Sequence, residues 1–197
     1  RPILTRATHD RKRGVLYLIA GGYHRREGLH PEKLLASILA DAGLRSPRVA
    51  CVGSANGDDR GFFRWGVEWF KGAGAAGVTL APTAASRVGQ ALCRRILAES
   101  DIVFISGGDV EVGMRTLSAA GLVSLLRSLH RAGTPFAGLS AGSIMLGRLW
   151  VRWRDPGDDT TAEPFPCLGL APLVCDTHEE ADDWPELTTL LRVAPAR

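Results

Sequence analysis

The sequence predicts an α/β fold in which a mostly parallel sheet is covered by helices on both faces. Predicted strands and helices alternate along most of the chain, and the strands are continuous apolar runs rather than alternating ones. Strands of this kind are typical of parallel sheets that are buried on both faces. Polar, glycine-rich loops follow four of the strands, after residues 20, 52, 106 and 139. Open α/β sheets bind their ligands at such strand ends.

The first half of the chain begins with an apolar run at residues 15–20, which Gly21 and Gly22 end. This pattern predicts a buried strand that feeds a tight turn. Pro31 opens a helix whose apolar residues recur at spacings of three and four, and Gly43 stops it. Further strands are expected at residues 49–52 and 78–80, and further helices at 61–71 and 87–99. We interpret the aromatic residues of the 61–71 helix as core packing rather than as a ligand site.

The second half of the chain continues the alternation. Residues 101–106 form an apolar strand, a single helix is expected over residues 112–131, and another strand is expected over residues 135–139. Ser140 follows this last strand directly, so the chain carries a hydroxyl at the carboxyl end of a predicted strand.

A long irregular connection is expected at residues 152–166, a segment rich in charges and prolines. Loops of this length are often functional or mobile. A strand-like segment at residues 173–175 follows it and precedes His178.

The 197 residues suit one domain, with residues 1–13 as a loose basic N-terminal arm and residues 14–197 as a single α/β domain. The formal net charge is +3 and the pI is about 8.9. No aromatic residues are interleaved with the charges of the arm, so it offers no stacking platform and we expect no nucleic-acid partner. No apolar run is long enough to cross a bilayer, so we expect no membrane partner.

Four cysteines are present, and none forms a C-x-x-C pair, which argues against a zinc site. We expect no metal and no other cofactor. Cys51 and Cys93 lie in apolar patterns and are expected to be reduced core residues, which favours a cytoplasmic location. Because the sequence begins with Arg1 rather than Met, a removed leader stays open.

The strongest chemical motif is Gly138-Leu139-Ser140-Ala141-Gly142, which matches G-x-S-x-G between a predicted strand and a predicted helix. A sharp strand-to-helix turn leaves no room for large neighbours, so small residues flank the serine. The turn presents the serine hydroxyl at the end of the sheet, as a nucleophile requires. A glycine-rich turn with a capping serine is the structural alternative.

A serine nucleophile needs a general base, and histidine is the usual one. The chain has five histidines: His9, His24, His30, His130 and His178. His178 is the preferred base, because it lies downstream of Ser140 just after the strand-like segment. His24, which follows the first strand, is the reserve candidate.

The base in turn needs an orienting carboxylate. Asp155 lies in the long connection after Ser140 and is the first candidate, with Glu179 and Glu180 as alternatives. Other acidic residues compete with them: Asp158, Asp159, Glu163 and Asp176. Spacing alone leaves this choice open.

Hydrolysis through a tetrahedral intermediate also needs two N–H donors for the oxyanion. The Gly107-Gly108-Asp109 segment, at the end of the strand before Ser140, can offer one, because glycines let the backbone approach a ligand closely. The amide of Ala141 can offer the other. A tight turn is the structural alternative for the glycine pair.

Three segments together resemble the dipeptidase E and cyanophycinase family of serine peptidases. They are I-S-G-G-D, then A-G-L-S-A-G-S, then L-G-L-A-P-L-V-C-D-T-H. The resemblance spans residues 15–180 and implies the class I glutamine amidotransferase-like fold, a flavodoxin-like three-layer arrangement.

The resemblance also implies roles for individual residues. The family's nucleophile falls on Ser140, its histidine on His178 and, in dipeptidase E, its aspartate on Asp155. The oxyanion donors fall on Gly108 and Ala141. Substrate contacts are expected at three further residues: Gly107, Asp109 and Asn56, the last in a loop that borders the family's cleft.

The chain departs from this family after the histidine. Members that cut aspartyl bonds tend to carry an arginine-bearing stretch there, whereas this chain carries four carboxylates, those of Glu179, Glu180, Asp182 and Asp183. If these carboxylates face the cleft, they disfavour an acidic substrate residue and favour a basic or neutral one. Cyanophycinases place their carboxylate partner after the histidine, which keeps Glu179 and Glu180 open.

The sequence therefore predicts a serine-nucleophile hydrolase, specifically a peptidase that cuts small peptides through a Ser-His-Asp/Glu triad, and it leaves room for a homodimer. A catalytically inactive relative that binds a ligand or partner is the main alternative. An esterase of the α/β-hydrolase fold is disfavoured because few residues follow Ser140. Transfer of glutamine ammonia is disfavoured because position 140 is not cysteine.

Overall fold

The structure is a computed structural model that describes residues 14–21, 31–41, 43–83, 87–178 and 181–194. The predicted basic arm at residues 1–13 lies outside the described residues. No helix among the described residues is long and apolar enough to span a membrane.

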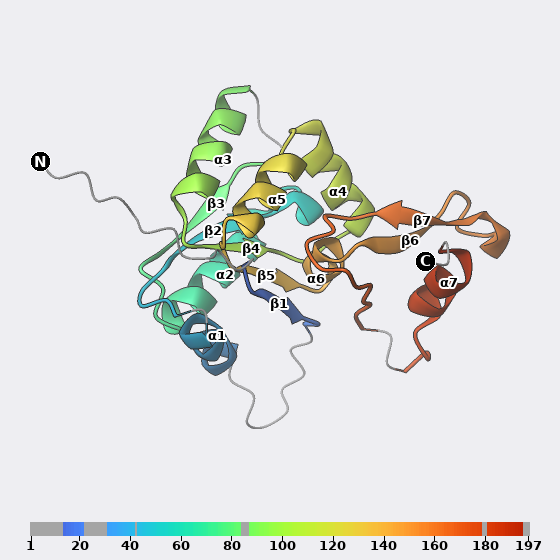
Figure 1. Cartoon of the computed structure of the whole chain (residues 1–197), viewed down its shortest axis with the longest axis horizontal. Helices are drawn as coiled ribbons and strands as arrows, with labels where there is room; N and C mark the ends of the chain where they lie inside the picture. Colours follow the sequence, from blue (N-terminus) through green and yellow to red (C-terminus); the bar gives the residue numbers. More distant parts are fainter. Residues whose placement is uncertain (1–13, 22–30, 42, 84–86, 179–180, 195–197) are drawn as a thin grey trace, which may run out of the picture.

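A five-stranded parallel sheet forms the centre of the described chain (Figure 1). Its strands lie in the order β1-β5-β4-β2-β3, and every pair of neighbours runs parallel. The bounds are β1 Leu16–Ile19, β2 Arg48–Val52, β3 Gly77–Ala81, β4 Ile102–Ile105 and β5 Phe136–Leu139. The prediction of a mostly parallel α/β sheet is confirmed.

Helices cover both faces of this sheet, as predicted. In Figure 1, α1 and α2 lie below the sheet, and α3, α4 and α5 lie above it. Their bounds are α1 Pro31–Asp41, α2 Arg60–Gly72, α3 Arg87–Glu99, α4 Val110–Ala119, α5 Val123–Arg131 and, on the same side as α3 to α5, α6 Ala141–Leu146.

The strands divide their side chains between two cores. Ala50 and Val52 of β2 pack with α3 to α6, whereas Val49 and Cys51 point to the opposite face and pack with α1 and α2. Strand residues alternate between the faces of a sheet, so a strand covered on both sides must be apolar throughout. This explains the continuous apolar runs in the sequence.

All four cysteines are free thiols in the structure. Burial raises the pKa of Cys51 to about 12, that of Cys93 to about 11 and that of Cys167 to about 12. The expectation that Cys51 and Cys93 are core residues is confirmed, since their side chains are almost fully buried.

The prediction of one helix over residues 112–131 is wrong, because α4 and α5 are separate helices. Gly121 has φ +62°, a left-handed conformation that ends the first helix. Arg94 donates to the carbonyls of Ala120 and Gly121 at 3.1 and 2.9 Å, which satisfies the groups that the break exposes. Both helices bury leucines in the same core, so the apolar periodicity continues across the break and conceals it.

Residues 152–166 are also more regular than predicted. Strand β6, Leu149–Trp153, pairs antiparallel with β7, Ala162–Pro166. Pro164 and Pro166 suggest a loop, but each lies in a two-stranded ribbon where half of the backbone N–H groups need no partner. Two short 3₁₀ turns, at Ser54–Asn56 and Asp159–Thr161, are further elements that the sequence did not predict.

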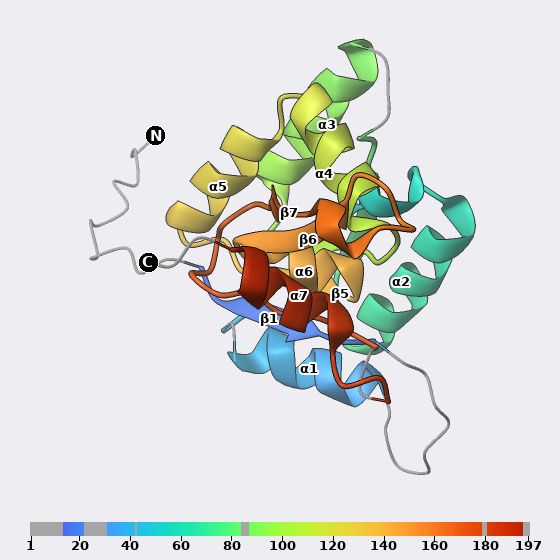
Figure 2. The ribbon, with the colours of Figure 1, turned by 90° about the vertical axis from the view of Figure 1, so that its right-hand side faces the viewer.

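The β6–β7 hairpin and helix α7, Pro185–Val193, form a separate layer beside the carboxyl end of the sheet (Figures 1 and 2). Helix α7 packs along the hairpin, and Trp150 Nε1 donates to Glu186 Oε2 at 2.7 Å. The predicted strand-like segment at residues 173–175 is not a strand; it is irregular, and the carbonyl oxygen of Leu173 accepts from the amide of Arg148, just before β6, at 2.8 Å.

A tight contact between backbones fixes the junction of β5 and α6. A Cβ atom on Gly142 would lie 2.1 Å from the carbonyl oxygen of Ile105, and one on Gly138 would lie 2.5 Å from that of Gly142. Neither clash can be relieved by rotating a side chain, because the atoms that are met belong to the backbone.

We therefore expect Gly142→Ala to destabilise the fold by about 2 kcal/mol or more, as overpacking of a buried site does. Gly77→Ala is the matched control, since an added Cβ there meets no atom within 4 Å. Thermal denaturation of the two variants compares them directly. Equal melting temperatures for both variants would show that the junction is looser than these distances indicate.

Candidate active site

Ser140 lies at the turn from β5 into α6, as the sequence predicts. Its backbone has φ +51° and ψ −121°, a conformation that is strained for a residue with a side chain and that characterises nucleophile elbows. Its amide donates to the carbonyl oxygen of Ile19 at 2.8 Å. The turn is thus anchored to the end of β1.

Ser143 reinforces this anchor, and the sequence analysis missed it. Its hydroxyl accepts a hydrogen bond from the amide of Ile19 at 2.9 Å and lies 2.7 Å from the carbonyl oxygen of Gly138. The second serine of the A-G-L-S-A-G-S motif was the available signal. The side chain is almost fully buried, so it ties β1, β5 and α6 together just below Ser140.

The structure brings His178 and Ser140 together across 38 residues of sequence. Nε2 of His178 lies 2.9 Å from Oγ of Ser140, within hydrogen-bonding distance. The imidazole also lies against Gly21, where an added Cβ would come within 3.0 Å of its Cε1 atom. The glycine after β1 therefore leaves room for the histidine ring.

The glycine pair after β4 lies close to the same hydroxyl. A Cβ on Gly107 would lie 3.3 Å from Cβ of Ser140. Gly108 has φ +142°, and a Cβ there would lie 2.1 Å from the carbonyl oxygen of Ala55, so only glycine fits. The next amide, that of Asp109, donates to the same Ala55 oxygen at 2.8 Å.

Asn56 holds the glycine turn from behind. Its Nδ2 donates to the carbonyl oxygen of Gly107 and to Oγ of Ser106, both at 3.0 Å. In a trans peptide the carbonyl and the following N–H point in opposite directions. The contact at the Gly107 oxygen therefore directs the N–H of Gly108 away from Asn56.

The amides of Gly108 and Ala141 donate to no acceptor in the part of the chain that the structure describes. Both residues line a pocket of about 180 Å³ that Ser140 also lines. Two unpaired N–H groups beside a hydroxyl that contacts an imidazole can accommodate the negative charge of a tetrahedral intermediate.

Helix α7, the hairpin and the chain before His178 complete this pocket. Three carboxylates line it, together with one indole: Asp109, Asp176, Glu186 and Trp150. Burial raises the pKa of Glu186 and the nearby charges of Asp176 and Asp109 raise it further, whereas the hydrogen bond from Trp150 lowers it. Among the described residues, no three His, Cys, Asp or Glu side chains form a group that could hold a metal ion.

Trp150, Asp176 and Glu186 enter the pocket from segments that the sequence analysis left without a structural role. Asp176 was only one of many candidate acids, and Glu186 follows Pro185 at the start of a helix that carries no motif. No pattern in the sequence placed α7 against the hairpin, so nothing marked these side chains as neighbours of Ser140.

The structure does not bring Asp155 to His178. Asp155 is exposed in the connection between β6 and β7, where its Oδ1 accepts from the amide of Gly157 at 3.0 Å. In the part of the chain that the structure describes, it forms no hydrogen bond or ion pair with the histidine. Among the expected substrate contacts, Asp109 lines the pocket, whereas Gly107 and Asn56 do not line it and instead contact each other.

Five further residues named in the sequence analysis concern the same region. The reserve base His24 and the alternative acids Glu179 and Glu180 lie outside the described residues. Asp182 and Asp183 are exposed and do not line the pocket.

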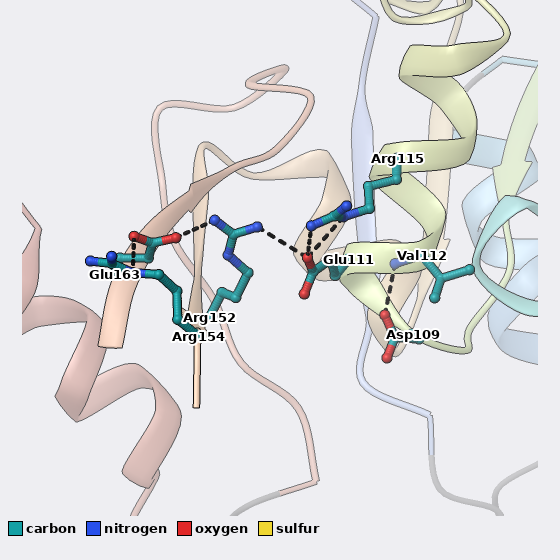
Figure 3. Close-up of polar contacts among 7 residues, drawn as sticks. All are labelled: Asp109, Glu111, Val112, Arg115, Arg152, Arg154 and Glu163. Carbon is teal, nitrogen blue, oxygen red and sulfur yellow. Dashed lines mark hydrogen bonds and ion pairs between the residues drawn. The ribbon is translucent and has the colours of Figure 1, made fainter. Parts of the chain in front are cut away.

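Ion pairs hold the hairpin to helix α4 beside the pocket (Figure 3). Arg152 on β6 donates to Glu111 at 3.1 Å and also contacts Glu163 on β7, while Arg154 Nε lies 3.1 Å from Glu163. Asp109 caps the same helix, since its Oδ1 accepts from the amide of Val112 at 2.8 Å. The hairpin, which forms one wall of the pocket, is thus linked by ion pairs to helix α4, whose first residues line the opposite side.

Comparisons with known proteins identify a sequence family and structures of similar fold. The sequence model of peptidase family S51 matches residues 16–194. Among solved structures, a peptidase from an acI-B1 Actinobacterium is similar with a TM-score of 0.67 and 15% identity, over 92% of this chain and 77% of that one. A candidate peptidase E from Listeria monocytogenes EGD-e is similar with a TM-score of 0.64 and 15% identity, over 90% and 87%. No curated protein matches.

The contact between Asn56 and the Gly107 carbonyl yields a prediction about the reactivity of Ser140. Asn56→Ala removes the group that orients the Gly108 amide, so we expect Ser140 to react about tenfold to hundredfold more slowly with a fluorophosphonate, somewhat less than the loss of a whole oxyanion donor. Labelling rates measured by mass spectrometry provide the value.

Ser106→Ala is the control for this variant, because it removes the other acceptor of the Asn56 amide and leaves the Gly107 contact intact. It should label at close to the rate of the unmodified protein. A similar loss in both variants would assign the effect to general loosening of the loop.

Proposed function

Because this chain belongs to peptidase family S51 and is a serine-type peptidase, we propose that Ser140 is its nucleophile and His178 its general base. The observation that carries the proposal is the distance of 2.9 Å between Ser140 Oγ and His178 Nε2, on a strained strand-to-helix turn. A general base must lie within this reach of the proton that it abstracts.

In the first half of the reaction, Ser140 Oγ forms a bond to the carbonyl carbon of a peptide while Nε2 of His178 takes the hydroxyl proton. The C–N bond of the tetrahedral intermediate then breaks, and the imidazolium returns this proton to the departing amine. The products of this half are a free amine and an ester of Ser140. In the second half, water attacks the ester with His178 again accepting the proton, and Ser140 regains it as the acid leaves.

The negative oxygen of the intermediate needs donors that are already in place. The proposal gives this role to the amides of Gly108 and Ala141. Its support is that both amides lack an acceptor among the described residues and that both residues line the pocket of Ser140. The Asn56 contact at Gly107 and the Ala55 contact at Asp109 hold the Gly108 peptide from both sides.

The carboxylate that orients His178 is proposed to be Glu179 or Glu180 ahead of Asp155. The carboxylate of Asp155 is exposed and accepts from the amide of Gly157, so it stabilises the turn between β6 and β7. Neighbours on an extended segment point to opposite faces, which would separate Glu179 from His178. His178, however, has φ +72°, so the chain is not extended at this residue and the argument against Glu179 does not apply.

The proposal also includes small peptides as substrates, because the pocket volume lies below the range that is typical of drug-sized ligands. A cytoplasmic setting is supported by the four free thiols. A homodimer and the lack of a nucleic-acid partner complete the proposal, and light scattering and a nucleic-acid binding assay check them.

We expect Ser140→Ala and His178→Ala each to remove nearly all hydrolysis of a short-peptide library, because nucleophile and base act as one unit. Product analysis by mass spectrometry measures this, with thermal melts to show that each variant is folded. Full activity in Ser140→Ala would exclude this residue as the nucleophile. A folded protein that neither cleaves the library nor labels at Ser140 would instead be an inactive, ligand-binding relative.

Replacing each candidate acid separately tests the carboxylate. We expect Glu179→Gln or Glu180→Gln to lower kcat by about 10²-fold to 10⁴-fold, the upper value being that of a lost triad aspartate in a well-studied protease. Asp155→Asn should lower it less than about tenfold. If Asp155→Asn is inactive while both glutamine variants keep full activity, the carboxylate comes from the hairpin.

A further inference from the structure

We propose, on the basis of the peptidase function above, that the pocket beside Ser140 binds a basic side chain of the substrate, that of lysine or arginine. Its lining contains the carboxylates of Asp109, Asp176 and Glu186 and the indole of Trp150. The sequence expectation of a basic or neutral preference rested on other residues, at positions 179–183, so these pocket residues are a new and separate basis.

Two observations mark this pocket as a ligand site independently of its charge. Ser140, whose hydroxyl contacts His178, lies in its wall. The amides of Gly108 and Ala141 face no acceptor among the described residues and lie in the same wall. A substrate carbonyl that reaches Ser140 therefore brings its neighbouring side chain beside the three carboxylates.

The carboxylates are held in place by hydrogen bonds. Asp109 accepts from the amide of Val112, and Asp176 accepts from the amides of Thr177 and Leu187, at 2.7 and 3.1 Å. Glu186 accepts from the indole of Trp150 at 2.7 Å. The donors to Asp109 and Asp176 are backbone amides, so they fix the orientation of these two carboxylates without cancelling their charge. The negative potential of the pocket is therefore built in before a ligand arrives.

The described lining contains no lysine or arginine. The nearest arginine along β6, Arg152, is instead paired with Glu111 and Glu163. Burial raises the pKa of Glu186, and the charges of Asp176 and Asp109 raise it further, so Glu186 is close enough to both aspartates to be repelled by them. A cation among them relieves this repulsion, whereas an acidic side chain increases it.

The arrangement fits an organic cation rather than a metal ion. The three acids do not form a metal-binding group, but an ammonium or guanidinium group on a long side chain can reach several carboxylates at once. Trp150 adds an aromatic side chain to the lining, and indole is the strongest aromatic partner of such cations.

The test compares short peptides that carry either lysine or norleucine beside the cleaved bond, because norleucine keeps the lysine chain without its charge. We expect kcat/KM to be about tenfold or more higher for lysine, as a charged hydrogen bond provides. Aspartate in that position should give the lowest value. N-acetylated versions of the same peptides should keep the preference; its loss on acetylation would assign the cation to the α-ammonium group and overturn the proposal for the side chain.

Glu186→Gln should reduce the preference for lysine over norleucine to less than about threefold while the norleucine peptide is still cleaved. Glu99→Gln, an exposed site on α3, removes the same charge outside the lining and should leave the preference intact. Asp109→Asn is the second variant, since asparagine also caps helices and the fold of α4 is retained.

Binding to Ser140→Ala protein, measured by calorimetry with the same peptides, separates this proposal from the catalytic one. Tighter binding of the lysine peptide supports the proposal. If the unmodified protein cleaves no peptide in the library, the peptidase function fails, but this binding result still supports the basic-side-chain pocket. Equal affinities for lysine and norleucine peptides overturn it, whether or not Ser140 reacts.

Discussion

The close approach of three backbone segments at the end of the sheet is the constraint on which the rest of the site depends. Gly142 lies against the carbonyl of Ile105, and Gly138 lies against that of Gly142, with no room for a side chain at either glycine. This contact fixes where α6 begins and forces Ser140 into its positive φ. The strain is local, and the turn is held by the hydrogen bond that the Ser140 amide donates to β1 and by the buried hydroxyl of Ser143.

Much of the fold could be predicted because its signals are local. Short apolar runs predicted all five strands of the central sheet, and the G-x-S-x-G pattern predicted the turn at Ser140. The break at Gly121 was missed because the leucines on either side of it serve one core, so their spacing does not change. The hairpin was missed because its prolines and charges suggest a loop, although a two-stranded ribbon tolerates both.

The site was predictable only where it is built from the sheet. Ser140 and the glycine pair lie at strand ends, and strand ends meet at one edge in a parallel sheet. Trp150 and Glu186, by contrast, reach the pocket through packing of α7 on the hairpin, which is a tertiary contact with no periodic signal. The interpretation of Asn56 as a substrate contact placed it in the right loop, but its amide faces the carbonyl side of the Gly107 peptide.

The pocket therefore has two walls of different origin. The sheet wall carries the hydroxyl and the two amides that donate to no acceptor among the described residues, and it is held by backbone contacts that tolerate almost no substitution. The hairpin and α7 form the other wall, and they are attached to α4 by side-chain ion pairs such as that of Arg152 with Glu111. Such a division lets the two walls evolve at different rates. Substitutions in the hairpin and α7 could therefore change which peptides fit the pocket, while the backbone around Ser140 stays the same.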